Sequence, residues 1–311
     1  MDLLERAFSI PMRMPFRGVT TRSGVLLNGP HGWGEFSPFP DYDESASALW
    51  LAAALEATSE PWPAPLRASI PVNVTVPAVG AGAAHSIVRS SGCRTAKVKV
   101  GDDGDEARVE AVRDALGPRG RIRIDVNGAW DVGNAAAKIK SLARYDLEYV
   151  EQPVASTPDM AALRRSVDVP IAADESIRKG DHRRVVELEA ADVAVLKVHP
   201  LGGIRRALQI AEELALPAVV SSAIETSIGI AAGVALAAAL PELPYACGLA
   251  TVALLSDDVV ADSLVPVEGS IVVRRPAVDD ARLERVEPAD GPEQRALFER
   301  LGRARAALAS V

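Results

Sequence analysis

Two lysines lie two residues apart in the short segment TAKVKV, residues 95–100. The segment has the apolar and β-branched content of a buried strand, and strand alternation places Lys97 and Lys99 on one face. Two neighbouring ammonium groups that are partly removed from water disfavour each other's charge, which lowers the pKa. A lysine tuned in this way acts as a general base near pH 7. Taken alone, however, such a pair is more typical of a solvated sheet edge.

Further charged residues follow Lys99 at a nearly constant interval. They come at steps of 26, 26, 23 and 23 residues, each near the C-terminal end of an apolar segment: Asp125, Glu151, Asp174 and Lys197. An isolated acid at a strand end often caps the next helix, and the motif DES that begins at Asp174 could do only that. Five matching positions in register with one period instead predict a shared site, with three acids between two lysine positions.

Three carboxylates that converge in a partly buried place cannot all stay ionised without a counter-charge. A divalent cation resolves this repulsion. The oxygen-only donor set, with no His or Cys beside it, favours a hard ion such as Mg²⁺, with Mn²⁺ as a substitute. A hard Lewis acid beside a lysine base suits the removal of a proton next to a carboxylate, because the metal stabilises the enolate dianion that results.

Short apolar segments that recur about every 25 residues would position these groups. They read as strands buried on both faces and span residues 95–100, 121–127, 147–153, 170–176, 193–199, 217–223 and 244–250, with 70–77 as a candidate eighth. Helical patterns lie between them, such as DEARVEAVRDALG and GGIRRALQIAEELALP. In the second, we expect the apolar stripe to consist of Ile204, Leu208, Ala211 and Ala215. About eight βα units without a glycine-rich phosphate motif favour a closed parallel barrel, whose site lies at the C-terminal ends of the strands.

The two ends of the chain differ from this repeating part. Residues 1–69 contain strand-like pieces and a helix from about 43 to 58, residues 266–276 look like strands, and 292–310 is an amphipathic helix. We interpret these ends as a second α+β domain attached to the barrel. The predicted division is 1–85, 86–265 for the barrel, and 266–311 returning to the first part.

The composition limits the class of protein. The 311 residues carry 34 Lys and Arg against 42 Asp and Glu, a net charge of −8, which argues against nucleic acid as a partner but not against a small anionic ligand. Cys93 and Cys247 are far apart and in no motif, which indicates a reducing cytoplasm. The beginning of the chain does not resemble a signal peptide, and the apolar stretch 227–240 is too short to span a bilayer and predicts a buried helix. We expect a cytoplasmic enzyme with a small carboxylate substrate and no membrane partner; the sequence leaves the oligomeric state open, and a monomer agrees with it.

Two further features are ambiguous. The segment SSAIETSIG, residues 221–229, ends a strand and begins a helix. Its hydroxyls either cap that helix or, together with the backbone amides, hold a ligand carboxylate. His199 follows Lys197 by two residues, and we expect it to lie behind the site or at its rim.

Longer motifs carry a family resemblance. The order of a Lys-x-Lys pair, three acids and a further lysine resembles the enolase superfamily and its muconate-lactonizing subgroup. Within that subgroup the chain most resembles the o-succinylbenzoate synthase family, through the motifs GWGEFSPF (32–39), YDES, LKVHPLGG (196–203), SSAIETSIG and CGLATVALLSDD. The resemblance covers nearly the whole chain. It implies a modified TIM barrel of the (β/α)7β type, with an α+β capping domain built from the N-terminal and C-terminal segments.

The resemblance also implies a metal site. Asp125, Glu151 and Asp174 match the family's Mg²⁺ ligands at the ends of the third, fourth and fifth barrel strands. The acid chosen from the motif DES is Asp174, with Glu175 adjacent to it.

The implied reaction is a syn elimination of water from 2-succinyl-6-hydroxy-2,4-cyclohexadiene-1-carboxylate through an enediolate. The product, 2-succinylbenzoate, is used in menaquinone biosynthesis. Lys99 would take the α-proton and then assist departure of hydroxide, with Lys97 as its electrostatic neighbour and Lys197 on the opposite face of the substrate. The residues implied to line the substrate pocket are Asn127, Ser222, Ala223, Gly248 and Leu249, with Arg17 as a contact from the capping domain.

Other functions remain open on the same residues. In an N-succinylamino acid racemase or a dipeptide epimerase, Lys99 and Lys197 would be two bases on opposite faces. A lysine Schiff-base lyase would need no metal. A barrel without catalytic activity would lack one of the acids or lysines, and none is missing.

Overall fold

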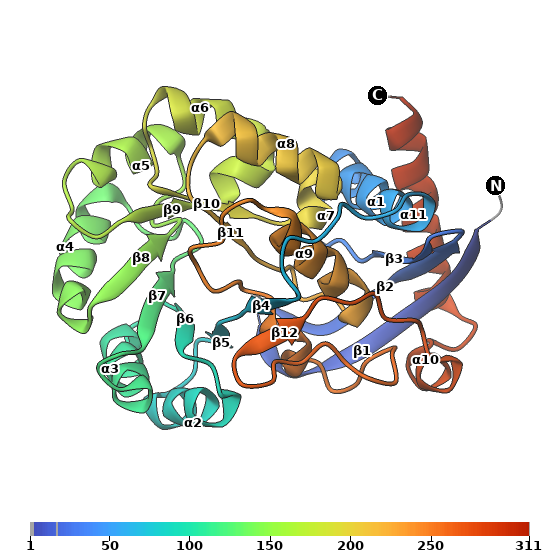
Figure 1. The fold of residues 1–311 in the computed structure, drawn as a ribbon, viewed down its shortest axis with the longest axis horizontal. Helices are drawn as coiled ribbons and strands as arrows, with labels where there is room; N and C mark the ends of the chain where they lie inside the picture. Colours follow the sequence, from blue (N-terminus) through green and yellow to red (C-terminus); the bar gives the residue numbers. More distant parts are fainter. Residues whose placement is uncertain (1–2, 17, 311) are drawn as a thin grey trace.

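The computed structural model describes residues 3–16 and 18–310, which form a barrel with a smaller sheet-and-helix domain beside it (Figure 1). The smaller domain, called the cap here, contains a three-stranded antiparallel sheet in the order β1-β2-β3. Its strands are β1 (Leu4–Phe16), β2 (Val19–Gly29) and β3 (Gly32–Phe36), and its helices are α1 (Glu44–Ser59), α10 (Asp280–Val286) and α11 (Pro292–Ala309).

The cap is built from both ends of the described chain. Its core joins side chains of the early strands, such as Phe8 and Val25, to Leu283 and Leu301 of the late helices. Figure 1 shows the red helix α11 lying beside the blue helix α1 and strands β1 and β2. Arg300 of α11 also donates hydrogen bonds to the backbone carbonyls of residues 38 and 39, at 2.9 and 2.6 Å. The late helices therefore complete a domain that the first residues begin.

The barrel is a seven-stranded parallel sheet in the order β11-β10-β9-β8-β7-β6-β5. Its strands are β5 (Val74–Val76), β6 (Thr95–Lys99), β7 (Arg121–Asp125), β8 (Leu147–Glu151), β9 (Ile171–Ala173), β10 (Val193–Leu196) and β11 (Ala218–Val220). The helices that connect them are α2 (Ala81–Ser91), α3 (Asp105–Leu116), α4 (Val132–Leu142), α5 (Thr157–Arg164), α6 (His182–Glu187), α7 (Val198–Leu201), α8 (Ile204–Leu214) and α9 (Ser227–Ala239). The predicted fold class, a modified (β/α)7β barrel with an α+β cap, is confirmed.

A segment that is not itself a strand joins the two edges of this sheet. Residues 244–250, predicted as a full strand, form only single parallel bridges, from Cys247 to Val72 and from Gly248 to Ser221. Next to β5, the carbonyl of Cys247 accepts a hydrogen bond from the N–H of Asn73 at 2.9 Å. On the other side, the N–H of Gly248 donates to the carbonyl of Val220 in β11 at 2.8 Å. The predicted extent of this strand is wrong, because the segment begins with a proline, which has no amide hydrogen to donate to a ladder.

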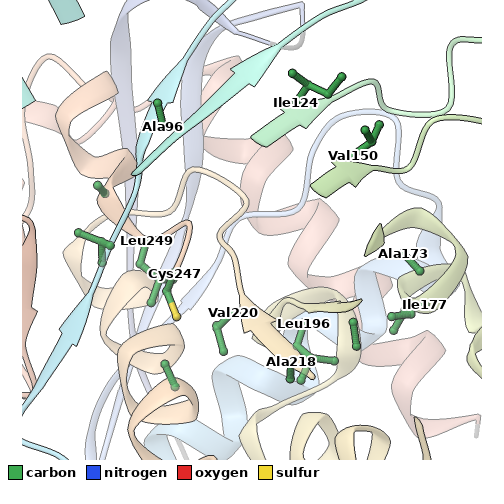
Figure 2. Close-up of a cluster of buried hydrophobic side chains, with 14 of the residues drawn as sticks. Ala96, Ile124, Val150, Ala173, Ile177, Leu196, Ala218, Val220, Cys247 and Leu249 are labelled. Carbon is green, nitrogen blue, oxygen red and sulfur yellow. The ribbon is translucent and has the colours of Figure 1, made fainter. Parts of the chain in front are cut away.

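Alternate residues of the barrel strands point outward into one hydrophobic layer beneath the helices. Figure 2 shows Ile124, Val150, Leu196 and Val220 from four strands in this cluster. Because side chains alternate along a strand, the residues between them point into the barrel. The charged site residues lie there at the strand ends, and Arg123 is buried deeper in the interior, where it donates to Asn73. This alternation leaves the two lysines of β6 on the inner face.

The boundaries of the two domains differ in detail from the predicted division. Strand β5 pairs with β6 in the barrel sheet, although a boundary at residue 85 assigns it to the cap. Strand β12 (Ser270–Val272) pairs with β4 (Ser69–Pro71), and Ile271 belongs to the barrel's core. We therefore propose that the barrel begins near residue 70 and that the chain re-enters the cap only after β12.

The apolar stretch 227–240 forms helix α9, and nearly all of its residues are buried. Within residues 3–16 and 18–310, no helix is both long enough and apolar enough to cross a membrane.

Candidate active site

The charged residues predicted for the site all lie at the C-terminal ends of barrel strands. Lys99, Asp125 and Glu151 are the last residues of three adjacent strands, at matched positions in the register. Asp174 directly follows β9, and Lys197 directly follows β10. Three strands separate β6 from β10, so Lys99 and Lys197 enter the same cavity from opposite walls.

Lys99 is held by two oxygen atoms of the neighbouring strand end. Its Nζ lies 2.6 Å from Oδ2 of Asp125 and 2.5 Å from Oδ1 of Asn127. Burial lowers the pKa of Lys99 and Lys97 lowers it further, whereas Asp125 opposes the decrease. The net shift is downward, as predicted for a lysine base, but burial contributes more than the neighbouring ammonium.

Lys97 has a different environment two residues earlier. Its Nζ lies 2.9 Å from Oε1 of Glu151 and 3.1 Å from Oδ2 of Asp125. Burial disfavours the ammonium, but these two carboxylates outweigh it and hold the pKa of Lys97 well above its usual value. Lys97 is therefore held as a cation two residues before Lys99, and the role of electrostatic neighbour stays a prediction.

On the opposite wall, Lys197 and an arginine that the sequence analysis missed share the carboxylate of Asp174. Lys197 Nζ lies 2.6 Å from Oδ2, and Arg178 Nε lies 3.3 Å from Oδ1. Burial tends to raise the pKa of Asp174, but these two cations lower it overall. Arg178 also donates to Glu175 at 2.7 Å and to the hydroxyl of Tyr42 in the cap. Its spacing of four residues after Asp174 was the available signal.

The donor set suits a hard divalent cation, although the side chains are not gathered around one position. Burial and Asp125 raise the pKa of Glu151 to about 7, although Lys97 opposes the increase. Oδ1 of Asp174 is buried and accepts no hydrogen bond. Among the residues that the structure describes, no group of three His, Cys, Asp or Glu side chains forms a metal cluster. Lysine ammonium groups stand between the carboxylates instead, and they must move aside for Asp125, Glu151 and Asp174 to share a cation.

The cavity above these charges contains most of the residues predicted to touch the substrate. Asn127, Ser222, Ala223 and Gly248 line it. The side chain of Leu249 is not part of the lining and packs instead in the hydrophobic cluster, as Figure 2 shows. Arg17 lies outside the described residues. The sequence analysis did not single out several other lining residues, among them Phe16, Phe39, Thr75, Ile224 and Thr251.

The amides at the start of helix α9 are already used by protein carboxylates. Glu35 of the cap accepts hydrogen bonds from the backbone N–H groups of Thr226 and Gly229, and Asp258 accepts one from Ser227. The side chain of Thr226 caps Ile228. Of the two interpretations of residues 221–229, the structure favours capping, and it leaves these amides without a free position for a ligand carboxylate.

His199 lies behind the cavity, as expected. It is buried, with Nδ1 3.0 Å from Oε1 of Glu225, and its ring stacks on Trp50 of the cap at 5.3 Å between centroids. It does not line the cavity. The histidine therefore belongs to the contact between cap and barrel.

Comparison with known proteins agrees with this architecture. Residues 81–277 match the family model described as "Enolase C-terminal domain-like", and residues 7–58 match the one described as "Enolase N-terminal domain-like". Among solved structures, the L-Ala-D/L-Glu epimerase from Bacillus subtilis has a TM-score of 0.79 at 23% identity, covering 89% of this chain and 97% of that chain. The muconate lactonizing enzyme from Pseudomonas fluorescens also has a TM-score of 0.79, at 22% identity, covering 92% and 98%. These likenesses show the fold.

Curated relatives are much more similar in sequence. The o-succinylbenzoate synthase of Thermobifida fusca (strain YX) is 62% identical over 288 residues, which cover 91% of this chain and 91% of that protein. The o-succinylbenzoate synthase of Mycolicibacterium smegmatis is 51% identical and covers 91% and 90%. The chain therefore belongs to the enolase superfamily and, within it, to the o-succinylbenzoate synthase family.

Proposed function

We propose that the protein dehydrates 2-succinyl-6-hydroxy-2,4-cyclohexadiene-1-carboxylate to 2-succinylbenzoate, with Mg²⁺ as its divalent metal ion. The observation that supports this substrate is the 62% identity to a curated o-succinylbenzoate synthase over 91% of the chain. Every acid and lysine that the chemistry needs is present at the end of its barrel strand. The product's use in menaquinone biosynthesis and a place in the cytoplasm belong to the same proposal.

The charge balance of the site supports a dianionic substrate bound together with a divalent ion. Four cations and four carboxylates meet there: Lys97, Lys99, Lys197 and Arg178 with Asp125, Glu151, Asp174 and Glu175. With all of these groups ionised, the cluster has no net charge. A divalent ion adds two positive charges, which the ring carboxylate and the succinyl carboxylate of the substrate would neutralise.

The lysines carry the proton transfers. The amine of Lys99 takes the proton from the carbon next to the ring carboxylate, and the electron pair of that bond moves toward the carboxylate. Collapse of this charge expels the hydroxide, which takes a proton from the ammonium of Lys99 and leaves as water, while the ring becomes aromatic. A metal ion held by Asp125, Glu151 and Asp174 would supply Lewis-acid stabilisation of the charge on the carboxylate.

Lys197 acts from the other wall. Its Nζ is paired with Asp174 and faces the cavity from the side opposite Lys99. A cation in this place stabilises the negative charge that develops and can lie against the ring. Lys197 accepts no proton in the dehydration.

The competing function is a racemase or epimerase, in which Lys197 would be a second base. Replacing Lys197 by arginine keeps the cation but removes a usable base, since arginine does not deprotonate in proteins. We therefore expect Lys197→Arg to keep a measurable part of the dehydration and to lose any racemisation of an N-succinyl amino acid, followed as deuterium uptake from D₂O. Equal loss of both reactions would show that Lys197 moves a proton in the dehydration as well.

A direct assay separates the two functions. Purified protein with Mg²⁺ is expected to convert the cyclohexadiene acid to 2-succinylbenzoate, followed by absorbance, with a larger kcat/KM than for racemisation of an N-succinyl amino acid. A larger kcat/KM for the amino acid would contradict the proposed function.

A further inference from the structure

The cap holds one wall of the substrate cavity through a buried carboxylate. Glu35, near the end of β3, is 1% exposed. Its Oε2 accepts hydrogen bonds from the N–H of Thr226 at 3.1 Å, the hydroxyl of Thr226 at 2.6 Å and the N–H of Gly229 at 3.0 Å. The fit is close, since a Cβ atom added at Gly229 would lie 3.0 Å from this oxygen. A cap residue therefore fixes the backbone where the barrel loop turns into α9.

A second cap residue binds the same turn at Ile224, two residues before Thr226. Arg22 of β2 is buried and donates to the backbone carbonyl of Ile224 at 3.1 Å and to that of Ser37 at 2.6 Å. The hydroxyl of Ser37 in turn donates to Oε1 of Glu35 at 2.7 Å. Arg22, Ser37 and Glu35 thus form one buried polar unit, the cap anchor, which crosses the domain boundary to Ile224 and Thr226.

The turn that the cap anchor holds is strained and lines the cavity. Ile224 has φ +62°, a left-handed conformation that is a true outlier for a β-branched residue and persists only where surrounding contacts impose it. Ile224 and its neighbours Ser222 and Ala223 all face the cavity. Within the turn, the N–H of Ala223 donates to the carboxylate of Glu225 at 2.8 Å. Without the cap anchor, we expect the turn to relax away from this conformation and to move the lining atoms with it.

We propose that Glu35 is a positioning residue for substrate binding: from the cap, it holds residues 222–226 in the strained turn that forms one wall of the cavity. It lies outside the cavity, so it acts through this turn and not by touching the substrate. The inference rests on the proposed function only for its choice of substrate. In this proposal, the cap contributes to substrate affinity, and this contribution is separate from the proton transfers of Lys99.

The test compares two buried carboxylates that cap the same helix. Glu35→Ala frees the turn, whereas Asp258→Ala removes a carboxylate whose hydrogen bonds come from Ser227 and Val259. We expect Glu35→Ala to raise KM for the dehydration by about tenfold or more, with kcat within about threefold, because binding is weakened more than chemistry. Asp258→Ala should lower the melting temperature and leave KM within about threefold.

Two further variants keep the test decisive. In Glu35→Gln, the amide oxygen can accept the three hydrogen bonds of Oε2, so KM should return close to the wild-type value. Glu35→Asp keeps the charge but is one methylene too short, so KM should rise even if the alanine variant does not fold. An unchanged KM in Glu35→Asp, or an equal rise in Asp258→Ala, would overturn the inference. Failure of wild-type protein to dehydrate the substrate would instead contradict the proposed function.

Discussion

Replacing Lys99 by alanine is expected to reduce kcat for dehydration by about 10⁴-fold, the upper end of what one general acid–base group contributes. In the proposed mechanism, the same side chain both removes the α-proton and returns a proton to the leaving hydroxide. No other lysine replaces it: Lys97 is held as an ammonium between Glu151 and Asp125, and Lys197 lies on the opposite wall. Steady-state turnover of the cyclohexadiene acid gives the measurement.

The variant should remain folded, because Asp125 keeps an ammonium partner in Lys97, 3.1 Å away. It should still bind metal, because Asp125, Glu151 and Asp174 are unchanged. The matched control is Lys140→Ala, an exposed lysine on α4, which should not change kcat. Substantial dehydration by Lys99→Ala, with Mg²⁺ present and the protein folded, would contradict the role given to Lys99.

Removal of divalent metal ions with EDTA is expected to abolish turnover, and addition of Mg²⁺ is expected to restore it. The four cations of the site are already paired with protein carboxylates, so they cannot alone compensate the charge that develops on the substrate carboxylate. The same addition should raise the melting temperature of metal-free protein, since a ligand at one hundred times its Kd stabilises the folded state by about 2.7 kcal/mol.

The increase in melting temperature with Mg²⁺ also tests which residues bind the metal, without a measurement of activity. Asp174→Ala should lose most of the Mg²⁺-dependent increase in melting temperature, whereas Asp168→Ala, an exposed acid just before β9, should keep it. Full activity in EDTA would favour the metal-independent Schiff-base chemistry. In that case, borohydride with substrate should trap a covalent adduct on a lysine.

The charged residues of the site could be found from the sequence because a parallel barrel repeats its geometry. Each βα unit returns the chain to the same end, so a constant interval between Lys99, Asp125 and Glu151 was enough to bring them together. Lys97 and Lys99 needed only strand alternation. These features depend on local periodicity, which a single sequence shows directly.

Features that depend on contacts between distant parts of the chain were not predicted. Glu35 meets Thr226 across a separation of 191 positions, and no local pattern shows such a pair. The apolar stripe of α8 was predicted only in part. Ile204 is buried, and Leu208 and Ala211 are half-buried against the core, but the fully buried residues also include Ala207, Ile210 and Leu214. Ala215 is exposed, because the helix ends at Leu214 and Ala215 has a left-handed conformation at φ +50°.

A cap assembled from both ends of the described chain has a consequence for the order of folding. During synthesis, β1 to β3 appear first, yet their core stays open until α10 and α11 supply Leu283 and Leu301. The whole barrel is made in between, so it can reach a compact state while the cap sheet still exposes apolar side chains. The backbone carbonyl of Phe39, a residue that lines the cavity, accepts a further hydrogen bond from Arg300 once α11 has docked. We therefore expect the substrate pocket to be completed late in folding, so that nascent chains that stall before α11 would carry Lys99 and Lys197 without a finished pocket.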